Sequence, residues 1–476
     1  MIPISEKEIL GRLSFDNPWW ESGEIESRFN DLPRRAYFPI FFELLKEDSV
    51  NRAAILMGPR RVGKTVLVYH AISELLSASV KPEQILYLSL ETPVYTGLSL
   101  EKIATTFQKL HEHNRDSKLY IFFDEVQYHK DWEVHLKSLV DSYPNFRFVA
   151  TGSAAAALKL KSQESGAGRF TDFLLPPLTF SEYLNFIELA EQLIDVTVSG
   201  DHHVYEATDI EELNKHFIDY LNFGGYPEAV FSPIVQKDPT RFIKSDIIDK
   251  VLLRDLPNLY GVNDIQELNK LFTVIAYNTG QEISLEQLSQ GAGISKNTLK
   301  RYITYLEAAF LIKIVNRVDC NAKKFKRATT FKVYLTNPSM RAALFGPVKD
   351  DSEAMGALTE TAIYSQWFHS AAVENLYYAR WKTGEVDLVY LLDSSQQPIW
   401  CIEVKWSDLP YTDKRKISSL IEFLKMNNLT ESMVTTKTIK AKKEIDLLEI
   451  DFKPSSLHTY SLGANLHERI ERRGLS

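Results

Sequence analysis

A glycine-rich octapeptide offers the clearest chemistry in this sequence. Residues 58–65 read GPRRVGKT and match the pattern G-x-x-x-x-G-K-[ST] of a phosphate-binding loop. The loop follows a short apolar run, residues 53–57, and precedes the helical run VLVYHAISELL. In this setting glycines let backbone N–H groups converge on phosphate oxygens, and the helix N-terminus adds its dipole. The pattern predicts a nucleotide site in which Lys64 reaches the β- and γ-phosphates and the Thr65 hydroxyl takes a place on Mg²⁺. The loop residues are Gly58, Pro59, Arg60, Arg61, Val62, Gly63, Lys64 and Thr65.

An acidic pair follows another apolar run. Residues 119–123 lead directly into Asp124 and Glu125. The carboxyl end of a strand in an open α/β sheet is where ligands bind. We expect Asp124 to hold Mg²⁺ through water, and Glu125 to orient and deprotonate the attacking water. Together with the loop, this pair predicts an enzyme that binds ATP and Mg²⁺ and hydrolyses the ATP.

Two further segments offer polar groups to the same site. Ser153 follows the apolar run 146–150 and suits a sensor of the γ-phosphate, although the same residues also suit an ordinary turn. Arg169, in a loop of small residues, is a candidate arginine finger acting in cis or from a neighbouring subunit. A solvated loop arginine is the alternative reading of Arg169, and Arg254 competes for the role.

The elements that must position these residues form an alternating pattern. Four apolar runs, each too short for a helix, are separated by helical stretches, which predicts buried parallel strands in a doubly wound α/β sheet. From about Asp172 the pattern becomes mostly helical, and residues 187–210 are hydrophilic enough to form an insertion or an exposed lid. The expected strands are residues 53–57, 85–90, 119–123 and 146–150.

A second change of pattern occurs near Asn263. Residues 283–312 read helix, turn, helix, with Ser295 as the expected N-cap of the second helix. The start of that helix is basic and would reach base edges in a helix-turn-helix protein. A basic stretch, residues 322–332, predicts a β-wing. These features indicate a DNA-binding winged helix, while a protein-interaction or lid element is the alternative. The basic and polar residues concerned are Lys296, Asn297, Lys300 and Arg301 in the helix, and Lys323, Lys324, Lys326 and Arg327 in the wing.

The C-terminal part carries acidic residues and a lysine on two expected strands, residues 385–392 and 399–406. Residues two apart in a strand share a face, so Glu403 and Lys405 point the same way. If the strands pair, Asp387 can join Glu403 around a divalent cation. Carboxylates bind Mg²⁺, the ion polarises phosphate and water, and Lys405 stabilises charge or positions the nucleophile. A β-hairpin with alternating exposed charges would look much the same.

Several motifs together resemble a large family of bacterial and archaeal AAA-like P-loop ATPases. They are GPRRVGKT, FFDE, ATGS, GRF followed by PPLTFSEY, and GGYPE. Members carry a helical lid, a winged helix and a C-terminal domain of formally unknown function, and the resemblance covers almost the whole chain after residue 45. One departure is Asn337, where members usually show an aspartate. The C-terminal pattern resembles the PD-(D/E)XK nuclease core, which implies that Glu360, on the preceding helix, is a further metal ligand.

Length and composition bound the remaining possibilities. The 476 residues, at about 150 residues per domain, predict roughly three domains. A net charge of −8 excludes a general polyanion binder, so DNA contact must be local. Two cysteines and the absence of an apolar leader fit a reducing cytoplasm. No apolar run is long enough to span a membrane. The expected parts are an extension (1–45), an AAA-like ATPase domain (46–262, with core 46–185 and lid 186–262), a winged helix (263–345) and a nuclease-like domain (346–476).

The sequence thus predicts Mg²⁺-dependent ATP binding and hydrolysis, coupled to a winged helix and a nuclease-like domain that act on DNA. A homo-oligomer in the cytoplasm is expected. The alternative is a nucleotide-dependent signalling or defence switch whose C-terminal domain binds a protein partner and does not cut DNA.

Overall fold

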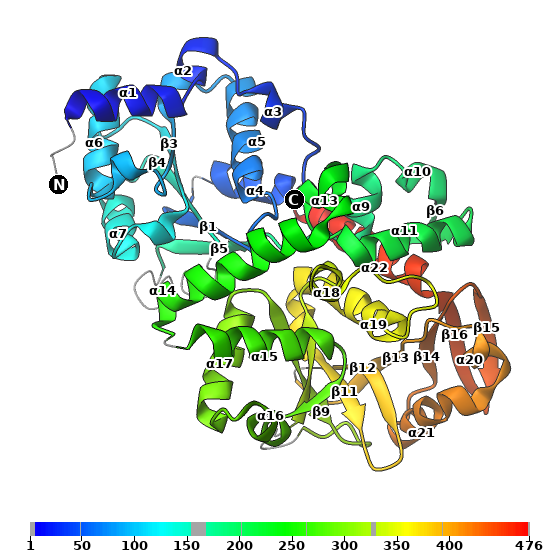
Figure 1. Cartoon of the computed structure of the whole chain (residues 1–476). Helices are drawn as coiled ribbons and strands as arrows, with labels where there is room; N and C mark the ends of the chain where they lie inside the picture. The colour runs from blue at the N-terminus through cyan, green and yellow to red at the C-terminus, as the bar shows by residue number, and fades with distance from the viewer. Residues whose placement is uncertain are drawn as a thin grey trace. The chain divides into compact units, whose positions relative to one another are not determined.

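The computed structural model describes residues 5–47, 49–153, 168–200, 202–262, 264–324, 330–392 and 394–474. The chain divides into two compact units (Figure 1). The first comprises Met1–Pro176 with Arg469–Ser476, and the second comprises Pro177–Glu468. This division differs from the expected boundary, because residues 186–262, expected as the lid of the ATPase domain, belong to the second unit.

The first unit contains a five-stranded parallel sheet in the order β2-β3-β4-β1-β5. The four apolar runs predicted as parallel strands are confirmed as β1 to β4. The fifth strand, β5, was not predicted, because its sequence FTDFL is only partly buried and lacks an apolar run. The strands are β1 (Ala53–Met57), β2 (Ile85–Ser89), β3 (Leu119–Asp124), β4 (Phe146–Gly152) and β5 (Phe170–Leu174).

Three helices connect these strands: α5 (Lys64–Ser77), α6 (Leu100–Leu110) and α7 (Trp132–Ser142). In α6 the buried residues Leu100, Ile103 and Phe107 recur at helical spacing, so one face packs inward while the charged residues face water. Short 3-10 turns, η1 (Pro82–Gln84), η2 (Pro93–Tyr95) and η3 (Val126–Tyr128), lie in the connections from β1 to β2, β2 to β3 and β3 to β4.

The N-terminal extension covers the free edge of strand β2. Asn17 pairs with this edge through its side chain: its Nδ2 donates to Tyr87 O at 2.8 Å, and Tyr87 N donates to Asn17 Oδ1 at 2.6 Å. The indole N–H groups of Trp19 and Trp20 both donate to Ile85 O, at 3.2 and 2.8 Å. The extension therefore satisfies backbone groups that an open sheet edge would leave unpaired. Its helices are α1 (Glu6–Asp16), α2 (Trp19–Ser22), α3 (Ser27–Asn30) and α4 (Phe38–Lys46).

The second unit begins with a mostly helical stretch. The hydrophilic region expected as an insertion or lid contains a two-stranded antiparallel hairpin, β6 (Ile194–Ser199) and β7 (His202–Ala207). Val198 on this hairpin is 70% exposed. The helices are α9 (Phe180–Phe186), α10 (Ala190–Leu193), α11 (Ile210–Phe223), α12 (Pro227–Phe231), α13 (Pro233–Lys237), the π-helices η4 (Thr240–Asp249) and η5 (Val251–Asp255), and α14 (Leu256–Tyr260).

Two helices occupy the positions predicted for a helix-turn-helix. Helix α16 (Leu285–Ala292) ends at Gly293, whose φ is 70°, and α17 (Lys296–Ala308) begins after Ser295. The Ser295 hydroxyl accepts from Thr298 N at 3.2 Å, as the N-cap prediction requires. Helix α15 (Ile265–Tyr277) and strands β8 (Glu282–Ser284), β9 (Ile312–Val318) and β10 (Thr330–Leu335) complete this part.

A nine-stranded sheet joins the two parts of the chain that were expected as separate domains. Its order is β15-β16-β14-β13-β12-β11-β9-β10-β8. Strands β9 and β11 pair in parallel, with Tyr378 opposite Arg317, so the expected wing and the C-terminal part share one sheet. The remaining strands are β11 (Leu376–Arg380), β12 (Glu385–Leu391), β13 (Pro398–Glu403), β14 (Glu431–Thr436), β15 (Ala441–Ile445) and β16 (Leu448–Pro454). The remaining helices are α18 (Ser339–Phe345), α19 (Met355–Gln366), η6 (Trp367–His369), η7 (Ala371–Asn375), α20 (Leu409–Thr412), η8 (Lys414–Ile417), α21 (Ser418–Met426) and α22 (Ser455–Gly474).

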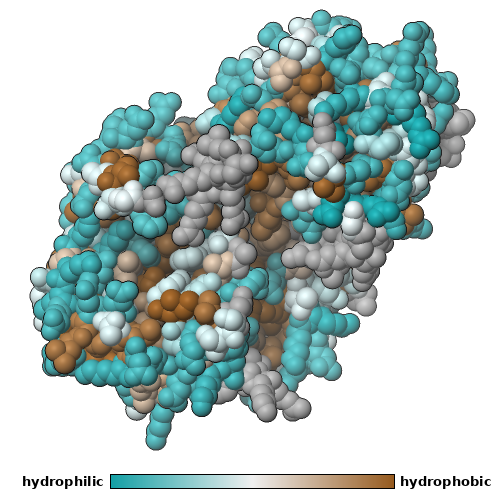
Figure 2. Space-filling model, turned by 180° about the vertical axis from the view of Figure 1, so that it is seen from behind, coloured by the Kyte–Doolittle hydropathy of each residue, from teal (hydrophilic) through white to brown (hydrophobic). Residues whose placement is uncertain are grey.

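Hydrophilic side chains cover most of the face shown in Figure 2, with apolar patches between them. Within the described part of the chain, no helix combines the length and the apolar character that crossing a bilayer requires.

Candidate nucleotide site and carboxylate cluster

The glycine-rich loop lies between β1 and α5, as the sequence predicted. Gly58 is needed for close packing, since a Cβ there would overlap the carbonyl oxygen of Leu175. Gly63 precedes α5 with a φ of 94°, a left-handed conformation that glycine adopts without strain. These two glycines explain why the loop can approach the sheet and then turn into the helix.

Lys64 is folded back onto its own loop. Its Nζ donates to Gly58 O at 3.0 Å and to Pro59 O at 2.8 Å, and the side chain is buried. An ammonium group has three N–H donors and no acceptor, so a bound phosphate would compete directly for these donors. The lysine is therefore held in the loop by two backbone carbonyls.

Asp124 collects three hydroxyl groups at the carboxyl end of β3. Thr65 Oγ1 donates to its Oδ2 at 3.0 Å, Tyr87 OH donates to the same oxygen at 2.8 Å, and Thr151 Oγ1 donates to its Oδ1. Burial raises the pKa of Tyr87 well above its usual value, and the charge of Asp124 adds to the effect. The Thr65 and Asp124 oxygens, predicted to hold Mg²⁺, thus lie together and provide the oxygen ligands that this ion prefers. Tyr87 was not predicted, because it lies inside an apolar run.

The backbone of Glu125 is left-handed, with φ 54°. Such a conformation is strained for a residue other than glycine and is frequent at functional sites. Gln127 Nε2 donates to Glu125 Oε2 and to Ser153 Oγ, the latter at 3.2 Å, and Ser153 Oγ lies 3.4 Å from Glu125 Oε2. Burial raises the pKa of Glu125, while the charge of Lys64 opposes the shift. The structure thus brings Glu125 and Ser153 together, and adds Gln127, which was not predicted.

Arg35, from the N-terminal extension, anchors the loop. Its NH1 donates to Val62 O at 2.6 Å and its NH2 donates to Pro176 O at 2.9 Å. The side chain is only 5% exposed. Within the loop itself, Arg60 NH2 donates to Tyr128 OH at 3.1 Å. The sequence did not identify Arg35, because no motif links it to a loop that lies 27 residues further along the chain.

Arg169 lies next to the amino end of β1, whereas the loop follows the carboxyl end of that strand. Strand β5 runs parallel to β1 with Phe170 opposite Ala53, and Ala53 N donates to Arg169 O at 2.9 Å. The loop leaves the other end of β1, after Met57, which is roughly 13 Å away along the strand. Arg169 Nε instead pairs with Asp141 Oδ1 at 2.6 Å, and both side chains are exposed. This placement excludes the cis arrangement in this structure, whereas action in trans stays a prediction. Arg254, the competing arginine, is exposed on η5 in the second unit.

The predicted metal-binding residues of the C-terminal part come together in the second unit. Strands β12 and β13 pair antiparallel, with Leu388 opposite Ile402, and this brings Asp387 near Glu403. Lys405 Nζ lies 2.6 Å from Glu403 Oε1 and 3.5 Å from Asp387 Oδ2. We call Glu360, Glu385, Asp387 and Glu403 the carboxylate cluster.

Lys332, on β10, enters this cluster and was not predicted. Its Nζ lies 2.8 Å from Glu360 Oε1, 2.6 Å from Glu385 Oε1 and 3.2 Å from Asp387 Oδ1. Tyr334, two residues further on the same strand, donates its hydroxyl to Glu360 Oε1. The sequence shows that Lys332 and Tyr334 are two residues apart and so share a face of one strand. It does not show that β9 and β11 lie between β10 and β12 in a single sheet.

Burial and charge act in opposite directions on the cluster. Burial, together with the charge of Asp387, raises the pKa of Glu360 to about 7 and that of Glu403 to about 8. Burial also acts to raise the pKa of Asp387, but Lys405 and Lys332 outweigh it and hold that pKa below its usual value. Among the described residues, Glu403 Oε2 is buried without a hydrogen-bond partner.

The Mg²⁺ predicted at this cluster does not fit the arrangement. A lysine ammonium lies where Glu360, Glu385 and Asp387 converge. Across the described ranges, no group of three or more His, Cys, Asp or Glu side chains is arranged to hold a metal ion. The carboxylates are instead matched to lysines.

Four residues predicted for DNA contact, three of them basic, lie at the start of α17. All four are exposed, and Lys296 Nζ lies 3.4 Å from Glu286 Oε1. In the expected wing, Lys323 and Lys324 are also exposed, whereas Lys326 and Arg327 lie outside the described residues. The four residues at the start of α17 are Lys296, Asn297, Lys300 and Arg301.

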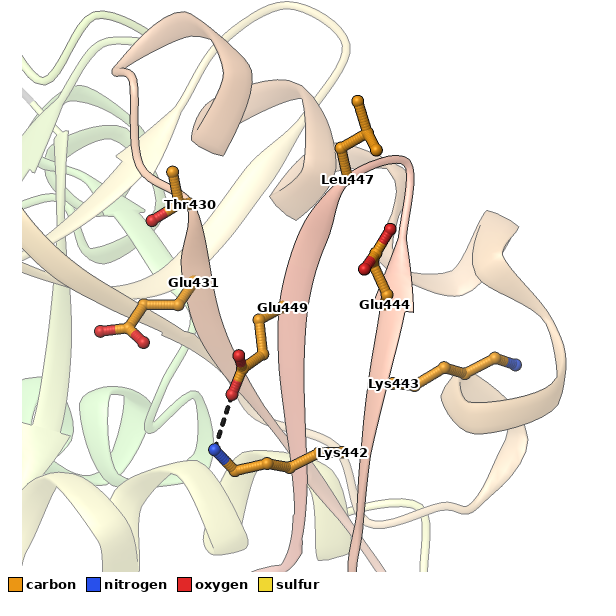
Figure 3. Close-up of a pocket in the computed structure, with 7 residues that line it drawn as sticks. All are labelled: Thr430, Glu431, Lys442, Lys443, Glu444, Leu447 and Glu449. Atoms are coloured by element: carbon orange, nitrogen blue, oxygen red, sulfur yellow. Dashed lines mark hydrogen bonds and ion pairs between the residues drawn. The ribbon is translucent and has the colours of Figure 1, made fainter.

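An open pocket of about 450 Å³ lies over β14, β15 and β16 (Figure 3). Lys442 reaches across it to Glu449, with Nζ 2.6 Å from Oε1, while Lys443 and Leu447 point away. None of the predicted site residues lines this pocket. Its lining is Thr430, Glu431, Lys442, Lys443, Glu444, Leu447 and Glu449.

Comparison with known proteins supports the nucleotide site. Residues 50–184 match a family described as an AAA domain, and residues 214–351 match a domain of unknown function. The AAA match, the five-stranded parallel sheet and the glycine-rich loop support an AAA-like, P-loop ATPase domain that binds ATP. They do not bear on DNA or on the carboxylate cluster.

The similar proteins carry little functional information. An uncharacterized protein of Haemophilus influenzae is 27% identical over 314 residues, which cover 64% of this chain and 72% of that protein. Another, of Methanocaldococcus jannaschii, is 22% identical over 392 residues, 81% of this chain and 82% of that protein. A solved Hsp104–ADP complex of S. cerevisiae is 12% identical with a TM-score of 0.30, covering 58% of this chain and 38% of that one. A replication initiator DnaA bound to AMPPCP and single-stranded DNA is 13% identical with a TM-score of 0.28, covering 57% and 86%. Likenesses this weak carry no argument about function.

Proposed function

We propose that the first unit is a Mg²⁺-dependent ATPase. The observation that carries the proposal is the hydrogen bond from Thr65, at the end of the glycine-rich loop, to Asp124, which Thr151 in turn connects to the backbone of Glu125. Loop N–H groups and the N-terminus of α5 would bind the phosphates, and Lys64 would exchange the carbonyls of Gly58 and Pro59 for phosphate oxygens. Thr65 and Asp124 would hold Mg²⁺, which neutralises charge on the phosphates when bound.

Glu125 is the proposed general base. Its carboxylate is half-buried, is held by Gln127 and has a raised pKa, so it can take a proton from water more readily than an exposed glutamate. Ser153 lies against the same oxygen and is the proposed γ-phosphate sensor. The role of Asp124 differs, since three hydroxyls hold it in place as a metal ligand.

ATP binding by the variant Lys64→Ala tests this proposal. We expect calorimetry with ATP and Mg²⁺ to show binding by the wild type and none by the variant. Lys46→Ala is a matched control, because Lys46 lies on α4 outside the loop, is exposed and pairs with a surface carboxylate, Glu43, at 2.7 Å. Undiminished ATP binding by Lys64→Ala would contradict the assigned loop chemistry.

We further propose DNA as a partner of the second unit, bound through the start of α17. Four exposed residues, three of them cationic, support this choice on a chain whose net charge is −8. Neutralised phosphates make affinity fall with salt, by a slope that decreases by about one for each phosphate contact removed. The double variant Lys300→Ala, Arg301→Ala should therefore bind DNA with a salt slope lower by about two.

A protein partner is the competing candidate. In that case the wild type would show no salt-dependent DNA retention, or the double variant would retain DNA as the wild type does. Either result would remove DNA from the proposal and leave a nucleotide-dependent switch.

A further inference from the structure

We propose that Lys332 is the resident cation of the carboxylate cluster, so that the nuclease-like part of the chain holds a lysine where a nuclease would hold a divalent metal. The proposal concerns the second unit and does not depend on ATP hydrolysis.

The contacts of Lys332 match the donor capacity of an ammonium group. Its Nζ faces one oxygen from each of three carboxylates, at 2.8 Å from Glu360, 2.6 Å from Glu385 and 3.2 Å from Asp387. An ammonium group has three N–H bonds and needs three acceptors when it is buried. The side chain is 2% exposed, so it is withdrawn from water. The ring of Tyr378 lies beside it, with its centroid 5.5 Å from Nζ.

The backbone fixes the lysine in this position. Strand β10 lies between β8 and β9. In the strand register, Lys332 lies opposite Glu282 of β8 and opposite Val315 of β9. Tyr334 projects from the same face of β10 and donates to Glu360. Lys332 therefore cannot leave the cluster by movement of a loop, because its strand is hydrogen-bonded on both sides.

A divalent ion would have to displace this lysine. Mg²⁺ requires oxygen ligands at about 2.0–2.1 Å in octahedral geometry. Lys332 already faces Asp387 Oδ1, while Val404 N donates to Asp387 Oδ2 at 2.9 Å. On the far side, Lys405 Nζ lies 2.6 Å from Glu403 Oε1. Two ammonium groups thus supply the positive charge that a metal would bring, and a metal would be repelled by both.

The buried Glu403 Oε2 has no hydrogen-bond partner among the described residues. This oxygen indicates that the cluster keeps one coordination position that the two lysines do not fill. If Lys332 is removed, Glu360, Asp387 and Glu403 therefore retain oxygens for a divalent cation, and only the ammonium group of Lys405, which is 35% exposed, remains beside them.

Mn²⁺ binding to the full chain tests the proposal. Electron paramagnetic resonance counts bound Mn²⁺ in four nucleotide-free proteins: the wild type, Asp387→Asn, Lys332→Met and the double variant Lys332→Met, Asp387→Asn. We expect the wild type and Asp387→Asn to bind equal amounts, since any Mn²⁺ at the glycine-rich loop is common to both. Lys332→Met should gain one Mn²⁺ site, and the double variant should lose it.

Lys313→Met is the matched control for the gained site. Lys313 lies on the neighbouring strand β9 and pairs with Glu307 and Glu374, outside the cluster. It should gain no Mn²⁺. The thermal midpoint of Lys332→Met should rise with millimolar Mn²⁺, whereas that of Lys313→Met should not respond beyond the wild type.

Two results would overturn the proposal. One is a Mn²⁺ site in the wild type that Asp387→Asn removes, and this comparison holds even if Lys332→Met fails to fold. The other is a folded Lys332→Met protein that gains no Mn²⁺ site, because the cluster would then not be a cation site that the lysine fills.

Discussion

Replacement of Arg35 by methionine tests whether the N-terminal extension shapes the nucleotide site. The change keeps the apolar stem and removes two hydrogen bonds, to Val62 O at 2.6 Å and to Pro176 O at 2.9 Å. A hydrogen bond from a charged donor contributes about 1.5–3 kcal/mol, so the two together contribute about 3 kcal/mol at the lower end. The lower end applies because water can enter and donate hydrogen bonds to the two carbonyl oxygens that the arginine leaves without a donor.

Only part of this energy concerns ATP, because Pro176 lies outside the loop. If the bond to Val62 accounts for half, about 1.5 kcal/mol, the Kd for ATP rises roughly tenfold, since 1.4 kcal/mol corresponds to a factor of ten. Calorimetry with ATP and Mg²⁺ measures Kd, and hydrogen exchange of residues 58–65 reports the loop directly. We expect faster exchange in the variant without ATP, and a smaller difference with ATP bound.

Arg34→Met provides the control. Arg34 is the neighbouring arginine, but it is exposed and pairs with Glu74 at 2.8 Å. An exposed pair of this kind contributes about 0–1 kcal/mol. If Arg35→Met leaves both Kd and loop exchange at wild-type values, or if Arg34→Met changes them equally, the anchoring role of Arg35 is refuted.

Three further predictions concern other parts of the chain. Arg169→Ala should lower kcat by about 10³-fold or more if this arginine acts in trans, and mixing it with Lys64→Ala should restore activity, because each variant supplies what the other lacks. Burial lowers the pKa of His458 to about 3, so the unfolded chain takes up a proton below about pH 6.5 while the folded chain does not. Stability is then lost as pH falls, by about 1.4 kcal/mol from pH 7.5 to 5.5, and denaturant titrations of His458→Leu should lack this loss. Lys332→Met should cost about 3–5 kcal/mol in the free energy of unfolding without added metal, measured by the same titrations, because it leaves buried carboxylates without their cation.

Each of these predictions has a result that contradicts it. An Arg169→Ala protein with wild-type kcat would remove the trans finger and favour Arg254→Ala as the next variant to measure. An unchanged acid response in His458→Leu would show that other groups dominate the pH dependence. A loss of stability in Lys332→Met no larger than in Lys313→Met would show that the cluster does not need its buried cation.

The nucleotide site was predictable because its chemistry is local in sequence. The loop joins β1 to α5, and Asp124 and Glu125 lie at the carboxyl end of β3, with only β4 between β3 and β1, so the carboxyl ends of these parallel strands bring them to the same side of the sheet. Tyr87 and Arg35 were not predictable. Tyr87 stands in an apolar run where a tyrosine resembles a packing residue, and Arg35 reaches the loop only because the extension folds back over the first unit.

The second unit was harder to predict for a different physical reason. Its sheet takes strands from both sides of the expected boundary at residues 345 and 346, and the pairing of β9 with β11 has no local signal. Lys332 was therefore expected in the wing, while the structure places it among carboxylates of the C-terminal part. Strand β5 was not predicted because it is a partly exposed edge strand and lacks the apolar run by which the other strands were found. Without β5, the position of Arg169, which directly precedes it, could not be predicted either.

Single-turnover hydrolysis of bound ATP by Glu125→Gln is the most direct test of the central claim. The variant keeps the size of the side chain and removes its capacity to accept a proton. General base catalysis contributes about 10²–10⁴-fold, so the hydrolysis rate should fall by at least about 100-fold while the Kd for ATP stays within a few-fold of the wild-type value. A variant that hydrolyses bound ATP at the wild-type rate would contradict the assignment of Glu125 and the account of the site built on it.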